Sequence, residues 1–286
     1  MELRIGTSGY SYPAWRGPFY PPELSPREML RFYAGQLPAV EINNTFYRLP
    51  SEKVLAGWAE QVPQDFRFAL KASQRITHHK RLRDAAEETG YLVRTARVLG
   101  ARLGALLFQL PPNLAADLAR LDAFLALLPD GLAAFEFRHA SWDQPEVRAR
   151  LAARGHAWVG ADTDERCWEG PLPSGRWGYL RLRRAGYGAG ELTDWAQRLA
   201  ASGWERAFVF FKHEDEGAAP RLARELLALM GGAGRAGSAA AGRRGSAGPE
   251  GRRRDSPPTP AAGDPPAPAR RRGAGRTGRG GPRAGR

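Results

Sequence analysis

Residues 103–139 read LGALLFQLPPNLAADLARLDAFLALLPDGLAAFEFRH, and this stretch decides the fold. It begins with an apolar run at 103–110, continues with an amphipathic segment at 114–129, and returns to an apolar run at 133–139. A short and nearly continuous apolar run is typical of a strand covered on both faces, and two parallel strands need a crossover that is usually a helix. The stretch therefore predicts a strand, a helix and a second strand parallel to the first.

The same alternation extends over the first 230 residues. Eight apolar runs predict strands at 3–8, 39–44, 66–72, 103–110, 133–139, 156–162, 177–183 and 206–213. Amphipathic segments predict seven helices at 25–37, 51–62, 84–100, 114–129, 144–155, 192–203 and 219–232. Eight strands that alternate with helices predict an α/β protein with a TIM-type (β/α)8 barrel, and an open doubly wound sheet is the alternative.

Some boundaries carry specific signals. Ser25 and Pro26 suit the N-cap and the first residue of the first helix. The connection at 163–176 is rich in Gly and Pro and predicts a loop. The Gly-rich segment 186–190 does not fit a dinucleotide-binding pattern, and we expect a flexible lid there.

The composition changes sharply after residue 230. The whole chain has 286 residues, 43 Lys and Arg against 30 Asp and Glu, and a net charge of +13. Residues 231–286 contain 13 Arg, three acids and no Leu, Ile, Val or aromatic residue, so most of the charge belongs to this tail. Such a segment cannot bury apolar surface, which predicts a barrel at 1–230 and a disordered C-terminal tail at 231–286. The tail is either genuine or a frameshift or readthrough extension, since its residue types are those of GC-rich codons.

Targeting signals, membrane spans and cysteines indicate the compartment and exclude some classes of protein. The start, MELRIGTSGYSYPAW, lacks a basic region followed by an apolar stretch, so we expect no signal peptide. No run of about 18 apolar residues predicts a membrane span, and a soluble cytoplasmic protein is expected. The single cysteine, Cys167, excludes a disulfide framework and a cysteine-based zinc module.

Polar residues end nearly every predicted strand. In a TIM barrel the carboxyl ends of the strands meet at one mouth, where the functional groups lie. Burying charged side chains there is costly unless they pair or bind a ligand, so the pattern predicts a site for a small polar or anionic ligand. The residues at the strand ends include Ser8, Glu41, Asn43, Lys71, Gln109, Glu136, Arg138, Asp162, Arg181 and Lys212.

Six motifs along residues 1–230 make the sequence resemble the DUF72 family, also called YecE-like. They are GTSGYSYPAWRGPFYP (6–21), VEINNTFYRLP (40–50), FALKASQRITHHKRL (68–82), LLFQLPPNL (106–114), FEFRHASW (135–142) and FVFFKHEDEG (209–217). The resemblance implies a TIM-barrel fold. It implies no established activity, because the family is related to sugar isomerases only loosely, by analogy of fold.

Four residues are the candidates for catalysis. Glu136 and Arg138 alternate along one strand and therefore share a face, as do Glu41 and Asn43 on another. Glu136 or Asp162 would act as general base, and Lys71 would neutralise a developing negative charge or form a Schiff base with a carbonyl substrate. The alternative is that these groups only form buried ion pairs. The catalytic candidates are Glu41, Lys71, Glu136 and Asp162.

Further residues are candidates for binding the substrate. Arg138 and Arg181 suit a phosphate or carboxylate, and aromatic side chains at the mouth suit stacking on a sugar or base, or simple loop packing. The substrate-binding candidates are Ser8, Tyr10, Asn43, Gln109, Arg138, Arg181, Lys212, His78 and Trp142.

No cofactor is predicted, and a divalent metal is the less favoured alternative. Carboxylates and histidines are available, but none follows a diagnostic spacing such as HExxH, and the neighbouring Lys and Arg would repel a cation. The metal ligands available in that alternative are Glu41, Glu136, Asp162, His78, His79, His139 and His213.

Three functions remain open from the sequence. The favoured one is an enzyme that performs acid/base chemistry, isomerase-like or hydrolytic, on a small polar or phosphorylated substrate. The second is a nucleic-acid-associated protein, or a barrel that acts on a phosphodiester, with phosphate contacts from the basic tail. The third is a ligand-binding barrel without catalysis. The oligomeric state is not predicted.

Overall fold

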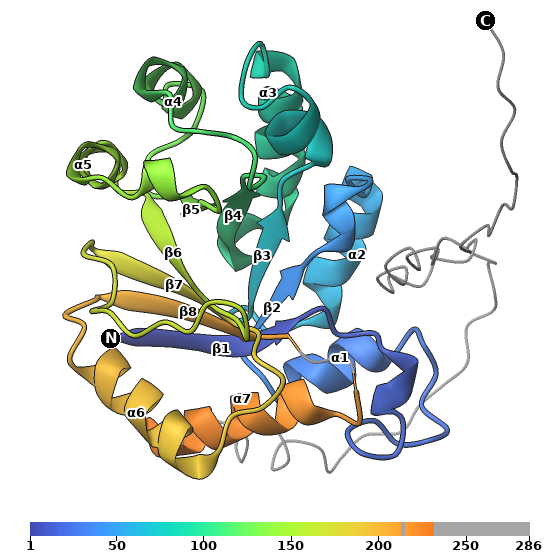
Figure 1. Cartoon of the computed structure of the whole chain (residues 1–286). Helices are drawn as coiled ribbons and strands as arrows, with labels where there is room; N and C mark the ends of the chain where they lie inside the picture. Colours follow the sequence, from blue (N-terminus) through green and yellow to red (C-terminus); the bar gives the residue numbers. More distant parts are fainter. Residues whose placement is uncertain (213–214, 232–286) are drawn as a thin grey trace, which may run out of the picture.

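The computed structural model describes residues 1–212 and 215–231. Its eight parallel strands follow one another around a closed barrel, and helices surround them (Figure 1). The strands are β1 (Glu2–Ser8), β2 (Ala39–Ile42), β3 (Arg67–Lys71), β4 (Leu103–Gln109), β5 (Ala133–Glu136), β6 (Ala157–Asp162), β7 (Trp177–Leu182) and β8 (Arg206–Phe211). The eight strands predicted from the apolar runs are confirmed.

Closure decides between the barrel and an open sheet. β1 pairs with β2 on one side and with β8 on the other, where the register runs from Glu2 opposite Arg206 to Thr7 opposite Phe211. An open sheet would leave β1 or β8 with a free edge. The predicted TIM-type barrel is therefore confirmed.

Seven α-helices cover the outside of the described barrel. They are α1 (Met29–Ala34), α2 (Glu52–Gln61), α3 (Ala86–Ala96), α4 (Leu118–Leu125), α5 (Pro145–Ala153), α6 (Ala189–Ala200) and α7 (Ala218–Leu229). The connection 163–176 contains no helix, as its Gly and Pro content predicted. Within residues 1–212 and 215–231, no helix combines the length and the apolar character that crossing a bilayer requires.

Several helix ends differ from the prediction. α1 begins at Met29 with Glu28 as its N-cap, and Ser25 donates a hydrogen bond to the Glu28 carboxylate instead of capping the helix. The helix expected at 84–100 ends at Ala96 and continues as a 3-10 turn, where Gly100 has a φ of 56°. These pieces of chain form turns that a hydrophobic pattern cannot distinguish from helix.

The Gly-rich segment after β7 leads directly into α6. Gly188 is the N-cap of α6, and its backbone N–H donates to the Glu191 carboxylate at 2.8 Å. Tyr187 is buried, so the segment is anchored on both sides. The prediction of a flexible lid at 186–190 stays a prediction, and the structure adds that Gly188 and Gly190 belong to the start of α6.

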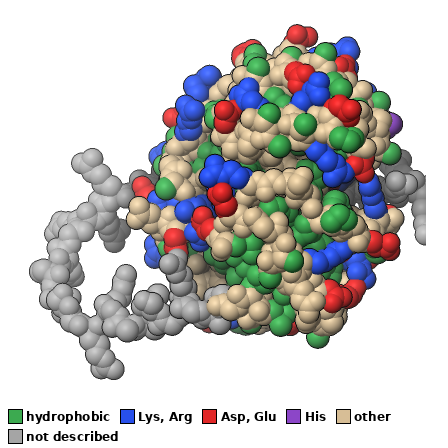
Figure 2. All heavy atoms as spheres, turned by 90° about the vertical axis from the view of Figure 1, so that its left-hand side faces the viewer, with side chains coloured by type: hydrophobic (Ala, Val, Ile, Leu, Met, Phe, Trp, Pro, Cys, Tyr) green, Lys and Arg blue, Asp and Glu red, His purple; other side chains and the backbone are tan. Residues whose placement is uncertain are grey.

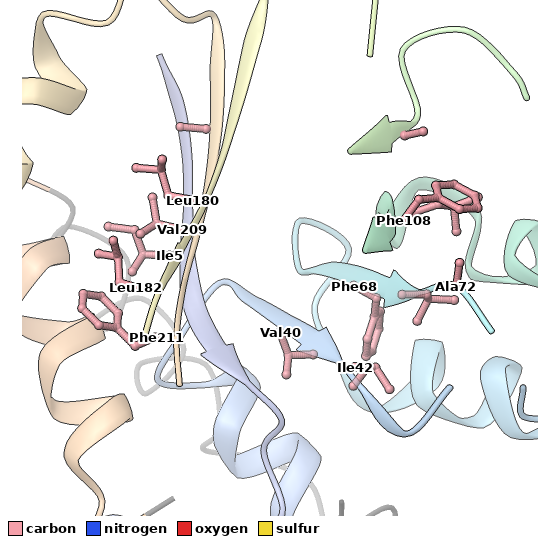
Figure 3. Close-up of a cluster of buried hydrophobic side chains, with 14 of the residues drawn as sticks. Ile5, Val40, Ile42, Phe68, Ala72, Phe108, Leu180, Leu182, Val209 and Phe211 are labelled. Atoms are coloured by element: carbon pink, nitrogen blue, oxygen red, sulfur yellow. The ribbon is translucent and has the colours of Figure 1, made fainter. Parts of the chain in front are cut away.

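The two faces of the barrel wall carry different apolar residues. Figure 3 shows Ile5, Leu180, Leu182, Val209 and Phe211 on the outer side of the wall, toward the helices. The inside is filled by a second cluster, with alanines from β2 to β5 opposite aromatic side chains from β7 and β8. Its members are Ala39, Ala69, Ala105, Leu107, Ala134, Ala157, Val159, Trp177, Tyr179, Phe208 and Phe210. Small residues on one side leave the volume that the large rings on the other side fill.

The predicted disorder of the tail concerns residues that, from 232 onward, lie outside the described part of the chain. The same holds for His213, one of the metal-ligand alternatives.

On the face of the barrel seen in Figure 2, basic and acidic side chains are interspersed.

Gly6 tests the packing between β1 and β2. A Cβ atom at Gly6 would lie 1.8 Å from the backbone oxygen of Ala39, so one strand would have to shift. We expect Gly6→Ala to lower the free energy of unfolding by about 1–3 kcal/mol in urea denaturation. Gly57, within α2, has open space around its Cβ position, and Gly57→Ala should be neutral or stabilising by up to about 1 kcal/mol. Equal effects of the two substitutions would contradict this packing.

Candidate active site at the barrel mouth

The strand register brings polar side chains from several strands to the inside of one barrel end. Ser8 lies opposite Glu41, and Gln109 lies opposite Glu136. Glu41, Gln109 and Glu136 each come two positions after an inward-facing alanine or leucine, so their side chains also face inward. Ser8 bonds Glu41 with its side chain and therefore lies on the same face. The predicted mouth therefore contains Ser8, Glu41, Lys71, Gln109, Glu136 and Arg181.

Arg181 joins two carboxylates across the barrel. Its Nη1 donates to Glu136 Oε2 at 2.6 Å and its Nη2 donates to Glu41 Oε1 at 2.7 Å. All three side chains are at most 2% exposed. Removing charges from water is expensive, and this cost is offset only where each charge has close partners of opposite sign.

The carboxylate oxygens of Glu41 also accept hydrogen bonds from other side chains. Ser8 Oγ donates to Glu41 Oε1 at 2.6 Å, and the Tyr179 hydroxyl donates to Oε2 at 2.7 Å. Asn43 Nδ2 adds a longer contact of 3.2 Å, as the alternation of positions 41 and 43 predicted. Burial raises the pKa of Glu41, but the charge and hydrogen bonds of Arg181 and its neighbours outweigh burial and hold that pKa below the usual range.

Glu136 is held by three guanidinium groups. Besides Arg181, Arg138 Nε and Arg183 Nη2 each donate to Oε1 at 3.1 Å. Burial raises the pKa of Glu136, but the three nearby charges lower it far below its usual value. A carboxylate stabilised in this way holds a proton poorly, so Glu136 and Glu41 are weak proton acceptors near neutral pH.

Lys71 is the exception in this network. Its ammonium lies 4.3 Å from the centre of the Phe46 ring, and within residues 1–212 and 215–231 no oxygen atom accepts a hydrogen bond from it. Burial lowers the pKa of Lys71, the positive charge of Arg181 lowers it further, and Glu41 and Glu136 offset this only in part, which places it at about 7. An amine with this pKa exists in both protonation states at neutral pH.

His78 forms the rim beside Lys71. Its ring packs edge-on against Phe46 at 4.9 Å, and Nδ1 shares a hydrogen bond with the Thr77 hydroxyl at 2.8 Å. Burial and the charge of Lys71 lower the pKa of His78 to about 4, so its ring is neutral at neutral pH. His78 is therefore placed at the mouth, as predicted, without a positive charge.

Asp162 is not brought to this group. It lies opposite Leu182 in the register, on the face of the wall that carries Leu182 and not Arg181. Its Oδ1 accepts from the Trp168 backbone N–H and its Oδ2 from the Tyr187 hydroxyl, both at 2.7 Å. The Asp162 side chain holds two loops on the outer face of the wall. The geometry therefore does not support Asp162 as a base in the mouth.

In the described part of the chain, three other binding candidates form no hydrogen bond or ring contact with Lys71. Trp142 is fully buried and its indole N–H donates to the Leu114 carbonyl at 2.7 Å. Tyr10 is buried against Tyr33 and lines a small pocket beside Asn43. Lys212 is exposed at the end of β8. Trp142 thus packs in a loop and does not stack on a ligand, which was the alternative that the sequence left open.

The structure adds two residues to the predicted catalytic and binding candidates. Tyr179 bonds Glu41, and Arg183, a polar residue at the end of the seventh predicted strand, bonds Glu136. Tyr179 could have been found from the alternation of WGYLRLR, because residues 179, 181 and 183 share one face.

Among residues 1–212 and 215–231, three buried donors near these carboxylates have no acceptor. They are Gln109 Nε2, Arg181 Nε and Arg183 Nε. Buried donors without partners cost free energy, and they indicate where a water molecule or an oxygen-rich ligand is accommodated.

In the part of the chain that the structure describes, the polar residues of the mouth do not form a set of metal ligands. Among the described residues, no group of three or more His, Cys, Asp and Glu is placed to hold one. The space between Glu41 and Glu136 is taken by the Arg181 guanidinium, whose charge repels a cation. A divalent metal remains an alternative without geometric support.

Residues 4–244 match the family described as "Protein of unknown function DUF72". This chain belongs to the DUF72 family. The match ends at residue 244, beyond the barrel boundary that we expected at residue 230.

Solved structures support the family fold. A DUF72 family protein of Thermotoga maritima has a TM-score of 0.72 and 25% identity, with 81% of this chain and 100% of that chain covered. A DUF72 family protein of Enterococcus faecalis has a TM-score of 0.67 and 19% identity, with 80% and 95% covered.

The DUF72 chain is also similar to curated bacterial proteins. UPF0759 protein YunF of Bacillus subtilis is 28% identical over 54% of this chain and 59% of its own length. UPF0759 protein YecE of Escherichia coli is 35% identical over 44% of each chain. The matches thus span less than two thirds of these relatives. A xylose isomerase domain protein of Alicyclobacillus acidocaldarius has a TM-score of 0.50 and 14% identity, with 80% of this chain and 98% of that chain covered, and it shows the fold alone.

Replacing Arg181 tests the network. We expect Arg181→Leu to lower the free energy of unfolding by about 3–5 kcal/mol, because the buried Glu41 carboxylate loses the guanidinium group that bonds it. The exposed ion pair of Arg176 with Glu205 provides the control, and Arg176→Leu should leave the stability unchanged within error.

The pH dependence distinguishes this mechanism from a general packing defect. In the wild-type protein the pKa of Glu41 is lowered, so its stabilisation is present above its unfolded pKa and declines as the pH falls below it. In Arg181→Leu burial alone raises that pKa, so the folded state takes up a proton and the variant should become more stable as the pH falls from about 8 to about 5. A loss of stability that is the same at every pH in this window would contradict the assignment.

Proposed function

We propose that this DUF72 protein is an enzyme that transfers a proton to or from a small anionic substrate at the barrel mouth, with Lys71 as the proton-transferring group. The sequence favoured acid/base chemistry with Glu136 or Asp162 as base. Glu136 is stabilised as a carboxylate by three guanidinium groups, and Asp162 lies on the outer face. The role of base therefore passes to Lys71.

One observation carries this proposal. Lys71 is a half-buried amine without an oxygen partner among the described residues, next to two carboxylates whose oxygens are already bonded to arginine. A buried amine in this state reduces stability, because burial and the neighbouring Arg181 both oppose its charge. Catalytic groups commonly have a pKa near the working pH, and a shifted pKa in a polar mouth supports a functional role.

The same mouth supplies an anion-binding surface. Arg138 keeps an exposed fraction of 36%, while its Nε is fixed on Glu136. Arg183 is oriented by the same carboxylate. Three guanidinium groups face two carboxylates, so the mouth is positive even with Lys71 neutral. A phosphate or carboxylate of the substrate would bind to Arg138 and Arg183, and the positive charge would stabilise an enolate formed by removal of a proton next to a carbonyl.

Deuterium exchange tests the proton transfer with a panel of model carbonyl compounds in place of the natural substrate. Dihydroxyacetone phosphate and other small phosphorylated or carboxylated carbonyl compounds are incubated with the full chain in D2O, and NMR follows the loss of the C–H signal next to the carbonyl. We expect exchange that is faster for dihydroxyacetone phosphate than for dihydroxyacetone. Lys71→Met should reduce the rate by about 100-fold or more.

Lys53 provides the matched control, because it is an exposed lysine of α2, and Lys53→Met should exchange at the wild-type rate. Loss of activity through unfolding is distinguishable, since Lys71→Met should be more stable than wild type. The lowered pKa of Lys71 means that the unfolded chain binds more protons between about pH 7 and pH 10, so the gain is largest below pH 7 and vanishes above pH 10. Wild-type exchange in Lys71→Met would contradict the proposal, and anion binding without any exchange would favour the non-catalytic ligand-binding barrel.

The nucleic-acid alternative stays a prediction. It depended on residues 231–286, nearly all of which lie outside the described part of the chain.

A further inference from the structure

Lys71 differs from the other lysines of this chain in its surroundings. The sequence contains only four, Lys53, Lys71, Lys80 and Lys212. Lys80 is an ordinary paired lysine, with its ammonium 2.8 Å from a Glu88 oxygen and 2.6 Å from the Asp84 carbonyl. In the part of the chain that the structure describes, the Lys71 amine contacts the Phe46 ring and no oxygen. Its lone pair is therefore free to react when the amine is neutral.

The groups around Lys71 keep the amine unpaired. From β2 and β5 it faces Glu41 and Glu136, and from β7 it faces Arg181. Arg138 lies on the chain after β5, and His78, neutral at neutral pH, lies on the short helix after β3. The two carboxylates are bonded to arginines, so neither moves to neutralise Lys71 without giving up a buried ion pair.

We propose that Lys71 forms an imine with small aldehydes or ketones that also carry a carboxylate or phosphate. The proposal rests on the function proposed above, because it uses the same mouth and the same anion-binding arginines, and it adds a covalent step and a substrate class. An unpaired amine next to cationic groups in a partly water-excluded site is the arrangement that activates a lysine as a nucleophile.

The reaction needs no oxidant or metal. The Lys71 nitrogen attacks the carbonyl carbon, the π electrons of the C=O bond move to oxygen, and that oxygen takes up a proton while the nitrogen releases one. The carbinolamine then expels its hydroxyl group with a proton as water, and the nitrogen lone pair forms the C=N bond. The net change is one carbonyl compound joined to Lys71 and one water released. The positive charges of Arg138 and Arg181 would stabilise the negative charge that develops on the oxygen during attack.

Arg138 and Arg183 account for the preference for an anionic substrate. Arg138 is 36% exposed and Arg183 is 17% exposed, and both are fixed through Glu136. An anionic group bound to these guanidinium groups would hold the carbonyl carbon near Lys71, which raises the local concentration of the reactive group. An uncharged aldehyde would lack this anchor.

Reductive trapping tests the inference in the full-length wild-type protein. The protein is incubated at pH 7 with glyoxylate or with propanal in the presence of cyanoborohydride, which delivers hydride to the imine carbon and makes the adduct permanent. Peptide mass spectrometry then measures the rate of labelling at each of the four lysines and at the N-terminus. About half of Lys71 is the neutral amine at this pH, but far below about 1% of an ordinary lysine is, so we expect glyoxylate to label Lys71 at least about tenfold faster than Lys53.

The charge of the probe and Arg138 provide the controls. For each probe, the labelling rate at Lys71 is divided by the labelling rate at Lys53. This ratio should be higher for glyoxylate than for propanal. In Arg138→Leu the two ratios should become equal. Labelling of Lys71 no faster than that of Lys53 in the folded wild-type protein would overturn the inference. Equal normalised rates for glyoxylate and propanal would overturn the preference for an anionic substrate.

The outcome separates this inference from the proposed function. If deuterium exchange depends on Lys71 and no adduct forms there, imine formation is wrong and proton transfer stands. If an adduct forms at Lys71 and no substrate shows Lys71-dependent exchange, imine formation stands and proton transfer is contradicted.

Discussion

The bond between Arg181 and the two carboxylates Glu41 and Glu136 determines the chemistry of this barrel mouth. It links β7 to β2 at 2.7 Å and to β5 at 2.6 Å across the interior, and the three side chains are at most 2% exposed. Buried ions of this kind contribute little net stability, but removal of one partner leaves the others uncompensated. The network therefore keeps both carboxylates ionised and bonded, whether or not a substrate is present.

The state of Lys71 follows from that bond. Both Glu41 and Glu136 raise the pKa of Lys71, but neither is bonded to it. Arg181 holds both carboxylates. Burial and the positive charge of Arg181 therefore lower the pKa of Lys71, and Glu41 and Glu136 raise it only in part. The fold thus accepts a destabilising group at the end of β3, which is the pattern expected where a side chain serves a ligand and not the core.

The sequence predicted the barrel and its mouth well, because both depend on strong periodic signals. Short apolar runs separated by amphipathic segments located all eight strands, and alternation correctly paired Glu41 with Asn43 and Glu136 with Arg138. The direction of Asp162 could not be predicted, because AWVGAD is apolar at both odd and even positions and does not reveal which face is inside. Nor could spacing show which carboxylates Arg181 holds, since that depends on side-chain reach across the barrel.

The most direct test of the account is the pKa of Lys71 in the wild-type protein. With 13C-labelled lysine the chain gives four side-chain signals, and the signal lost in Lys71→Met belongs to Lys71. This signal should titrate with a midpoint at about 7. A midpoint at the ordinary lysine value of about 10.4 would contradict this assignment. It would mean that a carboxylate stabilises the charged amine, although both nearby carboxylates are bonded to Arg181.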